Sequence, residues 1–191
     1  MKSRRRIFIS ILVFSLACFT ATAGSLIADD INETLDSVSA AITEGKLDTS
    51  IEKLQGIPKS GLADKLLGRI QFLMGKAKYI KVSNDIGKSR SEGKQERDEL
   101  KKHQTPQLEE ALEHFKAAYS LAPESDWAQE ALYATGLVQD YGFLQRFDKA
   151  AEAYKFLSEK YPNSPLGQRA AQRMNIFRSM QGGGAHGGGQ K

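Results

Sequence analysis

Residues that carry enzymatic or metal chemistry are scarce in this chain of 191 residues. It contains one cysteine, Cys18, and three histidines, His103, His114 and His186. It has no recognisable Ser-His-Asp or paired-histidine arrangement and no G-x-x-x-x-G-K-[ST] phosphate loop. A metal site needs several ligands, and His186 stands alone among glycines, so it does not indicate one. The sequence therefore predicts a protein that is not an enzyme and holds no metal or cofactor.

Signals of β-structure are also missing. Between residues 24 and 181, apolar and polar residues do not alternate over any sustained stretch. Alanine, leucine, glutamate, lysine and glutamine dominate instead, and all five favour helices. We expect an all-α chain of about seven helices without strands.

The amino terminus has the layout of an export signal. Residues 1–6 are basic, residues 7–19 are an apolar run, and an A-x-A sequence ends at Ala23, just before Gly24. The run is shorter than the roughly 20 apolar residues that span a bilayer, so we expect a cleaved signal peptide over residues 1–23. The four basic residues of this segment account for the whole excess of 27 basic over 23 acidic residues, so the charge gives no reason to expect nucleic-acid binding.

A second interpretation of this segment stays open. The sequence Ser15-Leu16-Ala17-Cys18 resembles a bacterial lipobox, in which the cysteine is lipidated and becomes the first residue. We therefore expect either a periplasmic or secreted protein cleaved after Ala23, or an outer-membrane lipoprotein that meets the membrane only through Cys18. Cleavage after Ala23 would leave no cysteine, and therefore no disulfide and no thiolate metal site.

Apolar residues follow helical spacing in the second half of the chain. Those of segment 105–122 recur at i, i+3, i+4 and i+7 and form one stripe, which consists of Leu108, Ala111, Leu112, Phe115, Ala118, Tyr119 and Ala122. Thr105 is expected to cap this helix, with Pro106 in its first turn. Segment 148–161 repeats the design, with Asp148 as the expected cap. Further helices are expected at residues 30–44, 47–56, 62–81 and 126–143, and from Ser164 onward.

Three of these helices end in the same Pro-x-Ser sequence, which begins at Pro58, Pro123 and Pro162. Proline stops one helix, and the serine can cap the next. Before the second and third prolines, the apolar positions superimpose at an offset of 39 residues, so that Phe115 matches Tyr154. A fixed period of this kind is typical of a helical solenoid.

These residues resemble the tetratricopeptide repeat family, in particular repeats of bacterial cell-envelope proteins of the Tol–Pal-associated and outer-membrane assembly lipoprotein types. The resemblance covers residues 30–180, although the glycine of the family's first helix is poorly matched. It implies a right-handed solenoid of about three helix hairpins and a carboxyl-terminal capping helix, over residues 24–181. We expect a solvated insert at residues 82–104 and a disordered glycine-rich tail at residues 182–191.

The resemblance also implies a function. Family members bind proteins or peptides on the concave face that the first helices of the hairpins form. The matching positions here are Leu132, Thr135, Gln139 and Phe143, none of which is basic. We therefore expect a scaffold or adaptor of the cell envelope that binds a protein or peptide partner, with a membrane-tethered assembly factor as the alternative.

Arg169 and Arg173 are a further candidate for partner binding. They stand four residues apart on the last expected helix and could hold a partner carboxylate between them. The alternative is that this helix is the polar cap that ends a solenoid. Trp127 and Tyr141, with Phe143, are candidate contact aromatics, although for Trp127 we expect core packing in preference to partner contact.

Overall fold

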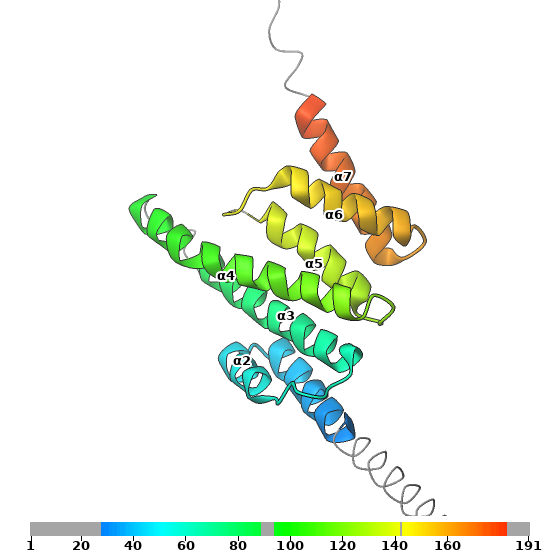
Figure 1. Ribbon diagram of the computed structural model, residues 1–191. Coiled ribbons are helices and arrows are strands. Elements are labelled where there is room, and N and C mark those ends of the chain that lie inside the picture. The colour runs from blue at the N-terminus through cyan, green and yellow to red at the C-terminus, as the bar shows by residue number, and fades with distance from the viewer. Residues whose placement is uncertain (1–27, 89–93, 142, 183–191) are drawn as a thin grey trace, which may run out of the picture.

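The computed structural model describes residues 28–88, 94–141 and 143–182 (Figure 1). Within these ranges the chain forms seven helices and no strand, which confirms the predicted all-α class. The helices are residues 28–43, α2 (Leu47–Gly56), α3 (Asp64–Lys88), α4 (Lys94–Leu121), α5 (Ala128–Asp140), α6 (Phe147–Lys160) and α7 (Pro165–Gly182). The predictions on Cys18, Ala23, Gly24 and His186 lie outside the described residues.

The helices pack in series along the chain (Figure 1). From α2 to α7, each helix contacts the one before it and the one after it, and two further contacts join α3 with α5 and α5 with α7. Helix 28–43 is bonded to α3 through Arg69, which donates to Asn32 and Asp36. We call helix 28–43, α3, α5 and α7 the first helices, and α2, α4 and α6 the second helices. The first helices thus lie next to one another. Among the second helices, α4 also contacts α6, where the rings of Tyr119 and Phe156 meet edge to face and Lys160 donates a hydrogen bond of 2.8 Å to the hydroxyl of Tyr119.

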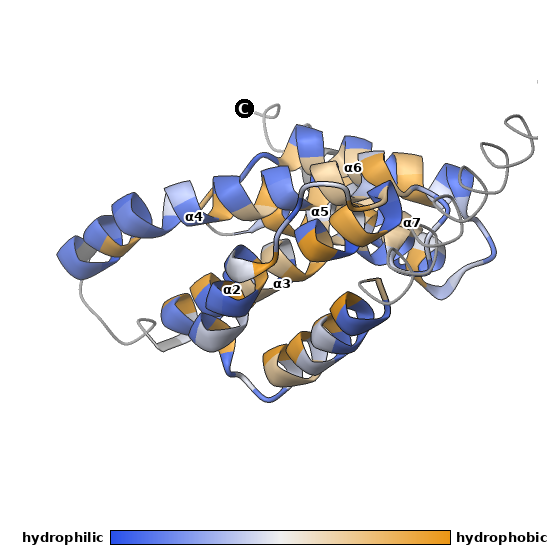
Figure 2. Cartoon of the chain, turned by 60° about the horizontal axis from the view of Figure 1, so that its bottom comes forward, coloured by the Kyte–Doolittle hydropathy of each residue, from blue (hydrophilic) through white to orange (hydrophobic). Residues whose placement is uncertain are grey.

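The predicted apolar stripes form much of the core. Hydrophobic and hydrophilic residues alternate along the ribbons of the helices, as expected of helices with one buried side (Figure 2). The stripe residues that are buried are Leu108, Ala111, Leu112, Phe115 and Ala118 of α4, and Ala150, Tyr154 and Leu157 of α6. Burial of such side chains is worth roughly 1.5–3 kcal/mol for each large one, and it holds each hairpin against the next.

A glycine–aromatic contact recurs in two hairpins. Gly136 of α5 lies against the ring of Tyr154 of α6, where a Cβ would come within 2.7 Å of Cζ. Gly75 of α3 lies in the same way against Phe115 of α4, where a Cβ would come within 3.1 Å of the ring. In both hairpins a glycine of the first helix therefore faces an aromatic ring of the second helix.

The helix starting near Thr105 differs from the prediction. The helix α4 begins at Lys94, so Thr105 is not a cap and Pro106 lies inside the helix. A proline there removes one backbone hydrogen bond, which normally interrupts a helix. Tertiary contacts favour the longer helix: Gln104 is buried and donates a hydrogen bond of 3.0 Å to the carboxylate of Asp85 in α3.

The expected insert at residues 82–104 is mostly helical. The helix α3 continues to Lys88, and both Val82 and Gln104 are buried between the two helices. Residues 95–99 and 101–103 of α4 are exposed and largely hydrophilic, and this end of the α3–α4 hairpin projects from the other helices (Figures 1 and 2). The insert therefore lengthens the middle hairpin, and its two ends are packed where we expected solvated chain.

Two other helix starts were also predicted wrongly. The helix α5 spans Ala128–Asp140, shorter than the expected 126–143, and Ser125 donates back to the carbonyl of Ala122 at 2.7 Å instead of capping α5. The residue Asp148 lies in the first turn of α6, one position inside it, so it is not the cap. The cap at Ser164 forms, because the N–H of Gly167 donates to its Oγ at 2.9 Å.

The helix α3 is linked by ion pairs to four other helices. These pairs are Arg69–Asp36 to helix 28–43, Lys81–Asp48 to α2, Lys78–Glu110 to α4 and Lys76–Glu130 to α5. An exposed pair contributes only about 0–1 kcal/mol, but four pairs on one helix fix its position among its neighbours. A search of the described helices for one long and apolar enough to span a membrane finds none.

Candidate functional site

Aromatic and charged side chains gather where the first helices meet. We call this the first-helix surface, and it comprises Arg69, Lys76 and Tyr79 of α3, Trp127, Glu130, Tyr133 and Asp140 in or next to α5, and Arg173 of α7, with the buried ring of Phe72 of α3 beneath them. Their contacts, described below, join helix 28–43 to α3, α3 to α5 and α5 to α7.

One ion pair joins each first helix to the next along this surface. Arg69 pairs with Asp36 of helix 28–43. The Nζ of Lys76 lies 2.9 Å from Oε1 of Glu130, and Nη1 of Arg173 lies 3.4 Å from Oδ2 of Asp140. These pairs fix the register of the four helices and leave a row of alternating charge across them.

Aromatic rings fill the spaces between the ion pairs. Phe72 and Trp127 stack with centroids 5.6 Å apart and planes at 15°. The ring of Tyr79 meets that of Tyr141 edge to face, also at 5.6 Å, while the ammonium of Lys76 lies 5.5 Å from the centroid of Phe72. Stacked rings and a cation over a ring each contribute of order 1 kcal/mol, so the surface is held rigidly.

A pocket of about 530 Å³ lies at one end of this surface. It is formed by helix 28–43, the start of α3 and the start of α5, and its lining consists of Asn32, Ala63, Lys65, Leu66, Arg69, Asp126 and Trp127. Gly68 of α3 makes room for the indole, because a Cβ there would come within 2.7 Å of Cη2 of Trp127.

Titratable groups cluster at the other end of the surface. Burial raises the pKa of Tyr79 to about 12, and the neighbouring Tyr141 adds to that rise. Burial also raises the pKa of Asp140, against the opposing effect of Arg173. The hydroxyl of Tyr154, near these groups, is buried without a hydrogen-bond partner in the described residues, and burial raises its pKa as well. The cluster therefore favours protonated, uncharged tyrosines.

The residues predicted at the concave face are mostly elsewhere. Leu132, Thr135 and Gln139 are buried in the structure, so their side chains pack inside and offer no surface to a partner. Phe143 is partly buried and packs against the larger core. The side chains that α5 presents on the first-helix surface are Glu130, Tyr133 and Asp140, which the sequence analysis did not name.

The two candidate arginines of α7 are not equivalent. Arg169 is exposed, and no described residue forms an ion pair with it. Arg173 is half-buried and already paired with Asp140, and it also interacts with Tyr133. The other exposed side chains of α7 include the polar Gln168, Gln172 and Asn175 and the apolar Ile176, which is 44% exposed. The arrangement does not leave the two guanidinium groups equally free for one partner carboxylate.

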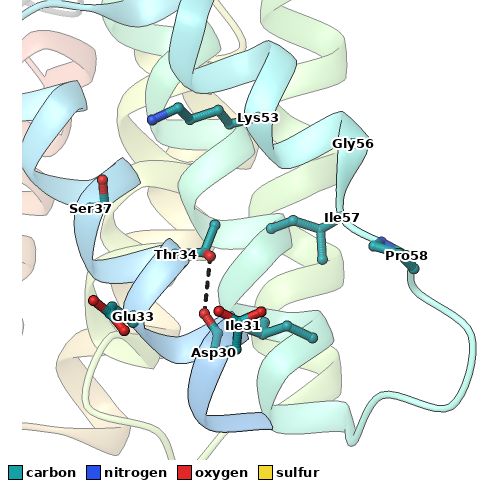
Figure 3. Close-up of a pocket in the computed structure, with 9 residues that line it drawn as sticks. All are labelled: Asp30, Ile31, Glu33, Thr34, Ser37, Lys53, Gly56, Ile57 and Pro58. Atoms are coloured by element: carbon teal, nitrogen blue, oxygen red, sulfur yellow. Dashed lines mark hydrogen bonds between the residues drawn. The ribbon is translucent and has the colours of Figure 1, made fainter. Parts of the chain in front are cut away.

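A larger hollow of about 680 Å³ lies within the first hairpin, away from the other first helices (Figure 3). Its lining includes Asp30 and Glu33 of helix 28–43 and Lys53 of α2. The hydroxyl of Thr34 donates to the carbonyl of Asp30 at 3.0 Å. No ion pair joins Lys53 to either carboxylate in this part of the structure, and no histidine or cysteine lines the hollow.

Histidine side chains do not form a reactive group here. His114 is half-buried on α4 and contacts Gln71, and burial followed by the charge of Lys78 lowers its pKa. His103 is exposed on the same helix. In the described ranges, no three histidine, cysteine, aspartate or glutamate side chains are placed to hold a metal ion.

Neither a scan against protein-family models nor a search of the curated proteins finds a match for this chain. The resemblance to the tetratricopeptide family therefore rests on the residues quoted above, and the function is argued from the first-helix surface.

Proposed function

We propose that this protein is an exported, non-catalytic scaffold or adaptor of the bacterial cell envelope. It holds a protein or peptide partner on the concave face of a right-handed, tetratricopeptide-like solenoid. The observation that carries this proposal is the first-helix surface, on which aromatic, arginine and lysine side chains gather where α3, α5 and α7 meet.

The packing pattern supports the solenoid. Serial contacts between neighbouring helices, together with direct contacts between successive first helices, are those of stacked hairpins. The contact of Gly75 with Phe115 and that of Gly136 with Tyr154 repeat one design in two hairpins. The exposed polar residues Gln168, Gln172 and Asn175 of α7 support a terminal cap, which a solenoid needs for solubility.

The chemistry of the surface supports partner binding. Tryptophan, tyrosine and arginine are the residues that most often dominate the energy of a protein interface. Here Trp127, Tyr133 and Tyr79 are only partly buried, and their neighbours hold them in place. A surface that is ordered before binding loses little entropy when a partner docks.

Photocrosslinking in the native cell envelope tests this function. The full chain would carry p-benzoylphenylalanine either at Tyr133, on the first-helix surface, or at Phe156, which is 46% exposed on α6. We expect a discrete crosslinked product from Tyr133 and none from Phe156. A product from Phe156 alone, or from neither position, would overturn the proposal.

Export is supported by the sequence of residues 1–24 and needs its own experiment. Mass spectrometry of the mature amino terminus distinguishes the two routes. A terminus at Gly24 supports a soluble envelope protein, whereas a lipid-modified Cys18 supports the alternative of an outer-membrane-tethered assembly factor. An intact Met1 terminus would contradict both.

A further inference from the structure

The pocket beside Trp127 has the size of a specific binding pocket. Its volume of about 530 Å³ lies within the range of roughly 300–1,000 Å³ that is usual for ligand sites. Three separate segments build it, namely helix 28–43, the start of α3 and the residues just before α5. The pocket therefore lies where the three described hairpins meet.

The apolar wall of this pocket is fixed in place. The indole of Trp127 stacks on Phe72 and rests on α3 at Gly68, where a side chain would collide with it. Leu66 lies beside it and is only partly buried. Together these groups form a rigid surface for an apolar side chain.

Two opposite charges line the same pocket and have no partner. Lys65 of α3 and Asp126, just before α5, are exposed, and neither forms an ion pair or hydrogen bond with any other residue that the structure describes. Arg69 differs, because it is bonded to Asn32 and Asp36. Unpaired rim charges orient a partner and select for the opposite charge at each point.

We infer that this pocket binds a partner segment in which an apolar side chain is flanked by an acidic residue on one side and a basic residue on the other. The apolar side chain packs against Trp127 and Leu66. The acidic residue pairs with Lys65, and the basic residue pairs with Asp126. This inference rests on the proposed function, since the pocket is one end of the first-helix surface.

Selection of random peptides displayed on phage tests this specificity. The full chain would be compared with Lys65→Glu, Asp126→Lys and, as a matched control, Lys149→Glu. Lys149 is an exposed lysine of α6, outside the pocket. All three substitutions change exposed side chains, so circular dichroism spectra should match that of the unchanged chain.

The unchanged chain and Lys149→Glu should enrich peptides with an apolar residue between an acid and a base. Lys65→Glu should lose the acidic preference and select a base at that position, and Asp126→Lys should lose the basic preference and select an acid. An exchange of preferred charge cannot arise from unfolding.

Two results would overturn the inference. If all four chains enrich peptides with the same charge pattern, the peptides bind elsewhere on the protein. The proposed function would then stand without this pocket. If the unchanged chain enriches no peptides, the inference fails, while crosslinking from Tyr133 decides the proposed function separately.

Discussion

The ring of Tyr154 lies against α5 at Gly136, a residue that has no side chain to collide with the ring. Any larger residue there would place a Cβ within 2.7 Å of the ring carbon Cζ. Phe177 of α7 stacks on the other side, with centroids 6.1 Å apart and planes at 26°. This single aromatic residue of a second helix therefore contacts two successive first helices, α5 and α7.

Substitution of this glycine should destabilise the protein. Gly136→Ala gains about 1 kcal/mol of helix propensity but overpacks the contact with Tyr154, which costs roughly 1–3 kcal/mol. Gly87→Ala is the matched control, since it changes a glycine of α3 whose Cβ would meet no atom within 4 Å. Urea unfolding should show Gly136→Ala to be the less stable by about 1–3 kcal/mol. Equal stabilities would show that the ring does not need this glycine.

Removal of the Tyr154 hydroxyl should not destabilise the protein. The group is buried and has no hydrogen-bond partner in the described residues, so Tyr154→Phe removes an unsatisfied polar atom and leaves the ring in place. Tyr141→Phe is the comparison, because the hydroxyl of Tyr141 bonds to that of Ser83 at 3.0 Å. We expect Tyr154→Phe to be neutral or stabilising and Tyr141→Phe to lose about 1 kcal/mol. A larger loss in Tyr154→Phe would reveal a partner for that hydroxyl.

Stability should fall at alkaline pH. The pKa of Tyr79 is raised to about 12 in the folded chain, whereas an unfolded tyrosine titrates near its ordinary value of about 10. Between these values the unfolded state loses the proton and the folded state keeps it, so stability decreases as pH rises. Thermal unfolding measured from pH 9 to pH 11.5 should show that the stability of Tyr79→Phe declines less steeply with pH than that of the unchanged chain. Identical slopes would contradict the burial of this hydroxyl.

Stability should also fall at mildly acidic pH. The pKa of His114 is lowered in the folded state by burial and by Lys78, so the unfolded chain takes up a proton first as pH falls below about 6.5. This contribution is present at neutral pH and is lost on acidification. Between pH 7 and pH 5, the variant His114→Gln should lose less stability than the unchanged chain. The variant His103→Gln, at an exposed histidine, should lose as much stability as the unchanged chain. If both variants lose stability equally, His114 is not the group responsible.

Much of the fold could be predicted from local sequence signals. The apolar stripes of α4 and α6 mark their buried faces, and the chain reverses at each Pro-x-Ser sequence as expected. The start of α4 could not be predicted in this way. Thr105-Pro106 is a strong local start signal, but contacts such as that of Gln104 with Asp85 come from another helix and favour the longer α4.

The first-helix surface was harder to predict than the fold. The predicted residue Leu132 is buried, whereas its neighbour Tyr133 faces the first-helix surface, and the same holds for Gln139 and the partly exposed Asp140. One residue corresponds to a rotation of about 100° on a helix, so a register error of one position exchanges an exposed side chain for a buried one. The ion pairs between first helices are also invisible in the sequence, because their partners lie more than thirty residues apart.

Occupancy of the first-helix surface in the cell is the most direct test of the whole account. Single cysteines would replace Glu130, on this surface of α5, and Glu152, an exposed glutamate of α6. The extent of maleimide labelling of the peptide that carries each introduced cysteine would then be compared between intact cells and the purified chain. We expect the cysteine at 130 to be protected in cells and that at 152 to label equally in both. Equal labelling of both positions in cells and in the purified chain would contradict the account.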